Sequence, residues 1–212
     1  MEIWDLYDKN KTLIGKTHTR GDELPDGCYH LVVHVWIKNS LNQYLITQRA
    51  ANRKTYPLMF ENVGGSVLAG ESSIQGAVRE VKEEVGLDFE GGTGKLVFSM
   101  VRDEVSGKKF NDIADVWFFD YNGDVDLSCA TTDEVCDWMW LDIDGIKKLY
   151  DEGKLVPTLE YIFDLHKKLQ KDKEKKKLMQ KNKKKSQQNR EKSKYFDYYD
   201  DIKHGSHKIV DW

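Results

Sequence analysis

Three glutamates in one short segment are the residues best suited to chemistry. Glu80, Glu83 and Glu84 are spaced i, i+3 and i+4, so on a helix their carboxylates share one face. Like charges at this spacing repel each other and destabilise an ordinary surface helix by roughly a few tenths of a kcal/mol per pair. A divalent cation would remove that penalty. Hard oxygen ligands with little histidine or cysteine nearby are typical of Mg²⁺ or Mn²⁺ sites.

The surrounding residues predict the helix that positions these acids. Ser72 with Gln75 three residues later fits a capping box, and Gly86 suits a left-handed end. One apolar stripe at helical spacing indicates a face that packs on a sheet: Ile74, Ala77, Val78, Val81 and Val85. At about 100° per residue, the acids lie well round the helix from that stripe, and we expect them to be open to a cleft.

The residues before this helix predict a loop that can approach a ligand. Gly64 and Gly65 end a strand-like segment at residues 60 to 63, and Gly70 precedes Glu71. Glycine lets the backbone come close to a ligand, and a backbone carbonyl can join the coordination of a hard cation. We therefore expect the loop and the acids to converge on one site.

Residues 65 to 87 match a family signature at every specified position. They run Gly65, five residues, Glu71, seven residues, then Arg79-Glu80-Val81-Lys82-Glu83-Glu84-Val85-Gly86-Leu87. This resembles the Nudix box G-x5-E-x7-R-E-U-x-E-E-x-G-U, where U is aliphatic. The resemblance implies an α/β fold, the Nudix-type α/β/α sandwich with a mixed sheet. It also implies a hydrolase that cleaves a nucleoside diphosphate linked to another moiety X, with Mg²⁺ or Mn²⁺ as cofactor.

Metal ligands follow from the resemblance position by position. It implies that Glu80, Glu83 and Glu84 hold the cation and that the carbonyl of Gly64 or Gly65 completes the inner shell. A bound cation neutralises the diphosphate and lowers the pKa of a coordinated water. An unbound carboxylate can then take the proton of that water, and the spacing leaves open which glutamate is the base.

Supporting residues are also implied. Glu71 and Arg79 would pair and brace the loop against the helix. Such enzymes often use a further glutamate six residues ahead of a tryptophan that begins a short strand, and Glu134 stands six residues before Trp140. Glu134 is therefore the fourth candidate catalytic residue. Its competitors for that role are Asp133, Glu104, Asp112 and Asp115.

Segments outside the box resemble the Nudix branch close to isopentenyl-diphosphate isomerase. They are residues 4–8, 15–21, 27–31 and 45–50, and with the box they extend the resemblance over roughly residues 2 to 165. An isomerase is therefore the alternative function. Its chemistry needs a cysteine just before the box, where this sequence has Val63-Gly64-Gly65, and its box is usually degenerate. Both departures favour hydrolysis.

Candidate substrate-binding residues lie before the box. Arg49, Arg53 and Lys54 form a basic group suited to a terminal phosphate, or else a solvated loop. His34 shares one face of the strand expected at residues 29 to 37 with His30 and Trp36. It would line the substrate cleft, or be a hydrogen-bonded core residue. Aromatic strand residues would stack on a base or, as is usual, pack in the core: Trp4, Tyr7 and Trp36.

Charge is strongly segregated along the chain. Residues 167 to 194 contain 13 Lys and one Arg against three acidic residues, a net of +11, so the other 184 residues carry −14. Lysines bind phosphates without sequence preference, which makes RNA a candidate partner and an RNA 5′-end pyrophosphohydrolase or RNA-binding protein a further alternative. The competing interpretation is a solvated helix extension or a disordered tail. Acidic and aromatic residues at 195–201 and 210–212 would fold back on the lysines or dock on a partner.

We expect three parts: an N-terminal hairpin at 1–27, the Nudix hydrolase domain at 28–170 and the extension at 171–212. Other strands are expected at 44–47, 95–102, 112–121 and 135–141, and further helices after Leu141 and from Pro157 until the lysine run. The longest apolar stretch is too short for a membrane helix, and the acidic N-terminus lacks an export signal. The three cysteines show no metal-site spacing. We therefore expect a cytoplasmic protein without membrane contact; a homodimer is compatible with the sequence.

Overall fold

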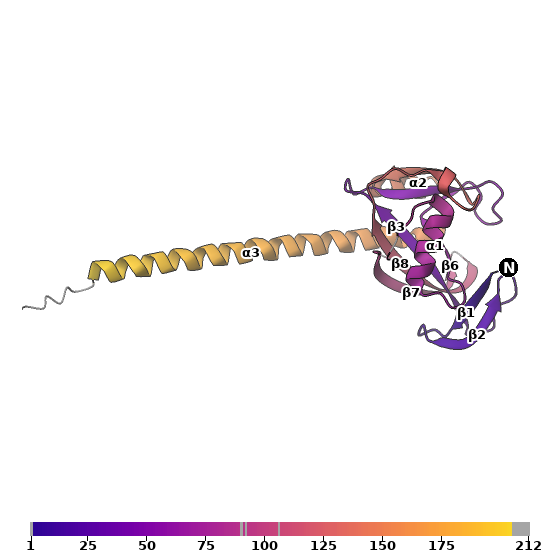
Figure 1. Ribbon diagram of the computed structural model, residues 1–212, viewed down its shortest axis with the longest axis horizontal. Coiled ribbons are helices and arrows are strands. Elements are labelled where there is room, and N and C mark those ends of the chain that lie inside the picture. Colours follow the sequence, from indigo (N-terminus) through magenta and orange to yellow (C-terminus); the bar gives the residue numbers. More distant parts are fainter. Residues whose placement is uncertain (1, 90, 92, 106, 205–212) are drawn as a thin grey trace, which may run out of the picture. The chain divides into compact units, whose positions relative to one another are not determined.

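A mixed β-sheet organises the first of two compact units in the chain, Met1–Ile162 and Phe163–Trp212 (Figure 1). The computed structural model describes residues 2–89, 91, 93–105 and 107–204. Its strands are β1 (Ile3–Tyr7), β2 (Leu13–Thr19), β3 (Tyr29–Lys38), β4 (Tyr44–Arg49), β5 (Phe60–Glu61), β6 (Val63–Ser66), β7 (Lys95–Val105), β8 (Lys108–Asp120) and β9 (Val135–Leu141). The helices are α1 (Ser73–Val85), α2 (Ile143–Asp151) and α3 (Tyr161–His204), with short 3₁₀ turns η1 (Leu127–Cys129) and η2 (Pro157–Leu159).

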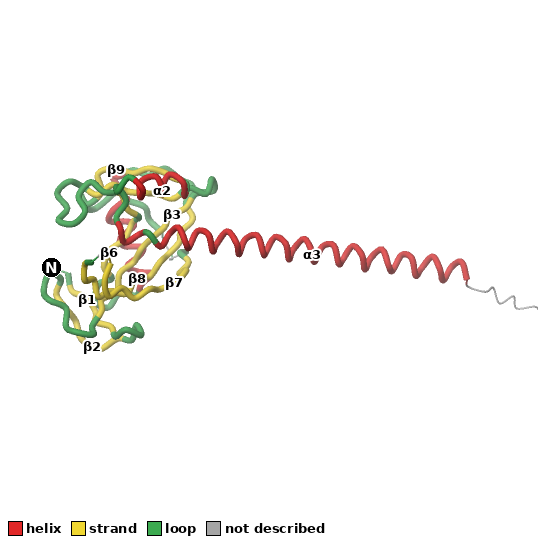
Figure 2. The backbone as a smooth tube through the Cα atoms, turned by 180° about the vertical axis from the view of Figure 1, so that it is seen from behind, coloured by secondary structure: helices red, strands yellow, loops and turns green. Residues whose placement is uncertain are grey.

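Strand β3 is the centre of the sheet. It pairs in parallel with β8 from His30 opposite Asp112 to Lys38 opposite Asp120. Its other edge pairs in succession with β1, β6 and β4, all antiparallel (Figure 2). Both of its faces are covered as well, because Tyr29 to Ile37 are all buried. The predicted strand at 29–37 and the predicted mixed sheet are therefore confirmed.

The two faces of β3 have different surroundings. Because side chains alternate along a strand, Val33, Val35 and Ile37 share one face, and this face belongs to the main hydrophobic core. Helix α1 closes that core with the predicted stripe, in which Ala77, Val81 and Val85 are fully buried. The opposite face carries His30 and His34 and faces a cavity. Strand β3 thus separates an apolar core from a polar site.

Helix α1 has the predicted ends. The Ser72 N–H donates to the Gln75 side-chain oxygen at 2.8 Å, which completes the capping box. At the other end Gly86 has φ +71°, the left-handed conformation, and its N–H donates to the Lys82 carbonyl. A side chain at Gly86 would also lie 2.6 Å from the backbone of Cys129. The predicted start and stop of this helix are therefore confirmed, and the packing against Cys129 also requires glycine at position 86.

Strand β6 differs from the expectation that Gly64 and Gly65 end a strand. Both glycines lie inside β6, and the segment expected at 60–63 is divided into β5 and β6 at Asn62. A Cβ at Gly64 would lie 2.3 Å from the Val33 carbonyl oxygen. Glycine is thus what lets this strand close against β3, so its role here is close packing and not turning.

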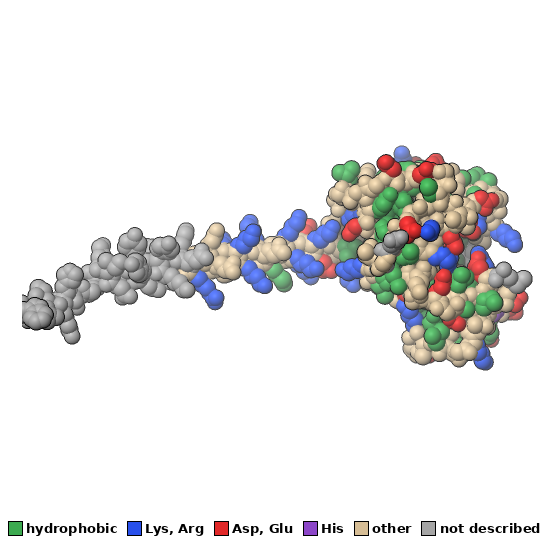
Figure 3. Space-filling view, in the orientation of Figure 1, with side chains coloured by type: hydrophobic (Ala, Val, Ile, Leu, Met, Phe, Trp, Pro, Cys, Tyr) green, Lys and Arg blue, Asp and Glu red, His purple; other side chains and the backbone are tan. Residues whose placement is uncertain are grey.

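Helix α3 also continues further than expected. The turn η2 begins at Pro157, and α3 runs through the lysine-rich segment to His204 instead of ending at it. Residues 171–190 are exposed all along the helix, and Figure 3 shows their Lys and Arg side chains on the visible side. Residues 205–212 and the side chains from 191 onward lie outside the described part, so the predictions for 195–201 and 210–212 are not tested. Within the described residues no helix combines the length and apolar character needed to cross a bilayer.

The N-terminal hairpin is attached to the sheet at two places. Strand β1 pairs with β3 through Leu6 opposite His30 and Tyr7 opposite Tyr29. At the hairpin turn, Lys11 Nζ lies 2.5 and 2.6 Å from the two oxygens of the fully buried Asp115 on β8. These contacts hold the turn end of the hairpin against the sheet.

Replacing Lys11 tests this attachment. Lys11→Met leaves the Asp115 carboxylate buried without its counter-ion, and because the Lys11 side chain is 32% exposed we expect a loss of about 2 kcal/mol of unfolding free energy. Urea denaturation measures it. Lys16→Met, an exposed change on β2, is the matched control and should leave stability unchanged. Equal stability of the two variants would contradict a structural role for the Lys11–Asp115 pair.

Candidate active site

The carboxylates of α1 lie against strand β6. A Cβ at Gly65 would be 2.4 Å from the Glu80 carboxylate, and the Gly64 N–H donates a hydrogen bond to Glu84. Glu80 and Glu84 are only 9% and 4% exposed, and Glu83 is half-buried. The expectation that all three acids are open to a cleft is therefore wrong for two of them. The reason is that Gly65, which has no side chain, lets α1 approach the strand closely enough to cover the acids.

One guanidinium links the carboxylates. Arg79 Nε and Nη2 donate to the two Glu71 oxygens at 2.9 and 3.1 Å, and Nη1 donates to Glu80 at 2.9 Å and to Glu83 at 2.8 Å. Nη2 also donates to the Ser66 carbonyl at 2.8 Å. Burial raises the pKa of Glu71, but hydrogen bonds from Arg79 and the Leu68 N–H outweigh it and hold this pKa below its usual value. The pair expected between Glu71 and Arg79 is present and connects the loop to the helix.

Glu84 is the carboxylate without an arginine partner. Its Oε2 is buried and accepts no hydrogen bond within the described part of the chain. Burial, and then the negative charges of Glu61, Glu80 and Glu134, raise the pKa of Glu84 well above its usual value. An ionised carboxylate is costly in such surroundings unless it is paired or binds a cation.

Two further glutamates face Glu84, each with its own arginine. Glu61 on β5 pairs with Arg49, and Glu134 lies 2.6 Å from Arg53 Nη2. Burial raises the pKa of Glu61 in spite of the Arg49 charge. Sequence analysis did not select Glu61. The available signal was a charged residue in a strand-like segment directly ahead of two glycines.

The donor set fits a hard divalent cation. Six glutamates around three arginines carry a net charge of −3 when all are ionised: Glu61, Glu71, Glu80, Glu83, Glu84 and Glu134 against Arg49, Arg53 and Arg79. Carboxylate oxygens are the ligands that Mg²⁺ and Mn²⁺ prefer. Among the described residues, no three acidic, imidazole or thiol groups have their ligating atoms already gathered at one point. Arg79 explains this in part, because it draws Glu80 and Glu83 toward its guanidinium.

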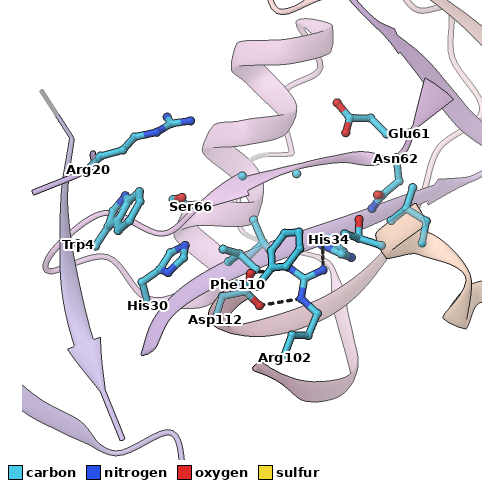
Figure 4. Close-up of a pocket in the computed structure, with 16 residues that line it drawn as sticks. Trp4, Arg20, His30, His34, Glu61, Asn62, Ser66, Arg102, Phe110 and Asp112 are labelled. Carbon is cyan, nitrogen blue, oxygen red and sulfur yellow. Dashed lines mark hydrogen bonds and ion pairs between the residues drawn. The ribbon is translucent and has the colours of Figure 1, made fainter. Parts of the chain in front are cut away.

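A cavity of about 280 Å³ adjoins the carboxylates. Glu61, a member of the glutamate cluster, lines this cavity (Figure 4). Gly64 and Gly65 line it too and lie against Glu84 and Glu80, so the cavity and the cluster meet at β5 and β6. Trp4 and Arg20 line it from the hairpin side. Sequence reasoning did not select Arg20, and it could not, because only the docking of the hairpin brings this residue to the site.

His34 lines the cavity with its two ring nitrogens already engaged. Arg102 Nη1 lies 3.3 Å from His34 Nε2, and the Tyr161 hydroxyl lies 2.8 Å from Nδ1. Arg102 in turn makes two 2.7 Å bonds to Asp112. Burial and the Arg102 charge lower the pKa of His34 well below its usual value, so the ring is neutral. Since Arg102 can only donate, Nε2 accepts and Nδ1 carries the proton.

The other residues predicted to bind substrate or act as the base lie partly at the glutamate cluster and partly away from it. Arg49 and Arg53 lie at the glutamate cluster, whereas Lys54 is exposed and is not among the residues that line the cavity. Glu134 immediately precedes β9, and Trp140 lies near the end of that strand instead of beginning it. Of its competitors, Asp112 pairs with Arg102, Asp115 pairs with Lys11, and Asp133 and Glu104 are exposed.

Comparison with known proteins identifies the family. A model of the NUDIX domain matches residues 29–161. The chain belongs to the Nudix family. It is 36% identical over 170 residues to an uncharacterized Nudix hydrolase of Listeria innocua, an alignment that covers 78% of this chain and 95% of the relative. A crystal structure of a Deinococcus radiodurans protein shares the fold with TM-score 0.63 at 17% identity, covering 79% of this chain and 98% of that one.

The predicted branch is also supported. An isopentenyl-diphosphate Delta-isomerase of Shigella boydii is 27% identical over 120 residues, covering 56% of this chain and 64% of that protein. The predicted α/β fold is confirmed, and this chain is a Nudix hydrolase, an enzyme that acts on phosphoanhydride bonds. The residues of the Nudix box lie on α1, β6 and the loop between them. Strands β1 and β2 lie outside the matched range.

The pKa of Glu80 leads to a prediction about metal removal. Burial raises this pKa from 4.5 to about 7, against the opposing effect of Arg79. Without a cation, the folded protein therefore holds the Glu80 proton more tightly than the unfolded chain does, and the free energy of unfolding falls as pH rises from about 4.5 to about 7. At pH 6 a cation must displace the proton of Glu80, whereas at pH 8 Glu80 is already largely ionised. We expect Mg²⁺, compared with EDTA, to raise the melting temperature about 3 °C more at pH 8 than at pH 6. Equal shifts at both pH values would contradict a cation contact with Glu80.

Proposed function

We propose that this Nudix hydrolase is a divalent-cation-dependent pyrophosphohydrolase that cleaves a nucleoside diphosphate linked to another moiety X. The observation that carries the proposal is the buried, unpartnered oxygen of Glu84 in a net-negative cluster beside a cavity. A diphosphate bound in this cavity would meet the glutamate cluster at Gly64 and Gly65, which line the cavity and lie against the cluster.

We assign the cation to Glu80, Glu83 and Glu84, with the carbonyl of Gly64 or Gly65 as a further ligand. A bound Mg²⁺ or Mn²⁺ would neutralise the diphosphate and lower the pKa of a coordinated water. In this proposal Arg79 releases or shares Glu80 and Glu83, and its contacts with Glu71 keep the loop in place meanwhile. A carboxylate of the cluster, Glu134 included, accepts the proton of the attacking water.

The isomerase alternative is less well supported. Val63 and Gly64 occupy the position just before the box where the isomerase chemistry needs a cysteine. Cys28 is half-buried and Cys129 and Cys136 are exposed, and none of them is among the residues that line the cavity of the described chain. The residues at the cavity include carboxylates, histidines and arginines, which suit water activation on a phosphoanhydride.

The proposal is tested by a substrate screen with Glu84→Gln. We expect the wild type with Mg²⁺ to release phosphate-containing products from one or more nucleoside diphosphate derivatives, and the variant to be at least about 100-fold slower. Without metal the variant should melt at the same or a higher temperature, because it removes the uncompensated carboxylate.

Two controls accompany this screen. Glu23→Gln makes the same chemical change at an exposed site and should retain full activity. Full turnover by Glu84→Gln at saturating Mg²⁺ would remove the assigned site. Isomerised product from isopentenyl diphosphate, without phosphate release, would replace the hydrolase proposal with the isomerase.

The exposed lysines of α3 favour RNA as a second partner. Over residues 171–190 they occur all round the helix, so a phosphate chain could contact them in any orientation. We expect the full-length protein to bind single-stranded RNA with an affinity that falls steeply as salt rises, and the chain ended after Gln170 to lose this binding.

The same truncation tests the predicted domain boundary. The chain ended after Gln170 should hydrolyse small nucleotides at the full-length rate. Filter binding at two salt concentrations and a turnover assay measure the two properties on the same pair of proteins. Absence of RNA binding by the full-length chain would exclude the RNA proposal, and loss of small-substrate turnover would show that the boundary is wrong.

A further inference from the structure

Helix α3 carries an unbroken line of four lysines in its exposed part. Lys173, Lys177, Lys181 and Lys185 follow one another at intervals of four residues. Side chains at this interval are neighbours on one face of an α-helix, about 6 Å apart along its axis. Every residue from 171 to 190 is exposed. The four ammonium groups therefore form one row along the outside of the helix, the lysine row.

The lysine row has little counter-charge of its own. Residues 175–190 contain seven lysines, one arginine and no acidic residue, and the one acid beside the row is Glu174. Within the described residues of α3 the only ion pair joins Lys167 to Asp164, ahead of the row. Like charges four residues apart destabilise a helix, as they do among the glutamates of α1. The row therefore favours an anion whose charges repeat along a line.

A second line of lysines at the same spacing has acids beside it. It consists of Lys167, Lys171 and Lys175. Asp164 and Asp172 border the same surface depression as these lysines, and Lys167 Nζ lies 3.5 Å from Asp164 Oδ1. Acids of the same helix thus offset part of the charge of this second line. The lysine row is longer and extends beyond these acids.

Single-stranded nucleic acid is the polyanion that fits this row. Its phosphates repeat along the backbone at a distance close to one step of the row, so each ammonium can meet a phosphate in turn. Residues 171–190 contain no aromatic side chain on which a base could stack, and only one arginine. The recognition that the row offers is therefore that of the phosphate backbone, without sequence preference.

A lipid surface fits the same segment less well. A helix that lies on a membrane buries an apolar face and keeps its basic residues on the opposite side. Leu178 and Met179 are the only apolar side chains of residues 171–190, and because they are consecutive they do not form a face. The segment thus has charge to offer a partner and no apolar surface to bury.

We propose that the lysine row binds consecutive phosphates of one single strand of RNA, and that this contact stabilises the helix by removing the repulsion along the row. This inference rests on the proposed RNA partner and names the surface that holds it. The contact is with phosphates alone, so a DNA strand of similar sequence binds equally well. No covalent bond forms or breaks at this surface.

Two variants of the full-length chain test the row, each with four lysines replaced by glutamine. The row variant carries Lys173→Gln, Lys177→Gln, Lys181→Gln and Lys185→Gln. The control variant carries Lys171→Gln, Lys175→Gln, Lys176→Gln and Lys183→Gln. Both remove the same charge, and glutamine and lysine have similar helix propensities, so the variants differ in the position of the lost charges. Filter binding of a short oligouridylate over a series of salt concentrations measures the affinity.

The salt dependence reports the number of phosphates contacted. Each contact with a single strand contributes about 0.7 to the slope of log K against log salt, so we expect the row variant to reduce the slope by about 2.8 and the control by less than about 1. Equal reductions would overturn the row and leave the RNA proposal in place, whereas absence of wild-type binding would reject both. Wild-type affinity about tenfold or more higher for oligouridylate than for oligothymidylate would also overturn a site of phosphates alone.

Circular dichroism of the free proteins at low salt tests the repulsion separately. The row variant removes three like-charge contacts at four-residue spacing, whereas the control removes one and also separates Asp172 from Lys175 and Lys176. We expect the helical signal of the row variant to exceed that of the wild type, and the signal of the control to be equal or lower. Less helix in the row variant than in the control would contradict the proposed repulsion. Failure of the hydrolase proposal would appear in the substrate screen and in neither of these measurements.

Discussion

Repulsion among the glutamates around α1 is the constraint on which the rest of the site depends. Three arginines reduce it, and they come from three places along the chain: Arg49 at the end of β4, Arg53 in the loop after it, and Arg79 on α1 itself. Glu84 remains without an arginine and lies deepest against β6. Burial makes each of these charges more costly than on a surface, which is why the arrangement favours a bound cation.

Strand β3 makes that cluster compatible with a stable core. Its alternation directs Val33, Val35 and Ile37 toward the apolar side of α1, while His30 and His34 face the cavity. The same strand pairs with β6, whose glycines bring Glu80 and Glu84 to the sheet, and with β1, which brings in the hairpin. One buried strand therefore sets the positions of the carboxylates, the cavity and the hairpin relative to one another.

The Nudix box and the hairpin contribute different residues around the carboxylates and the cavity. The Nudix box supplies groups for phosphoanhydride chemistry, and these lie on α1, β6 and the loop between them. The hairpin lies outside the domain match and contributes Trp4 and Arg20 to the cavity. The carboxylates and one side of the cavity thus come from different segments of the chain.

The sequence by itself determined the features that depend on neighbours along the chain. The spacing of Glu80, Glu83 and Glu84, the capping box and the apolar stripe follow from 3.6 residues per helical turn, and the box identified the family. Only the tertiary structure decided that Glu61 joins the cluster, that two of the acids are buried, that both nitrogens of His34 are engaged, and that Trp4 lines the cavity. These features arise where strands distant in sequence pair with each other, and residue spacing along a chain carries no record of which strands will pair.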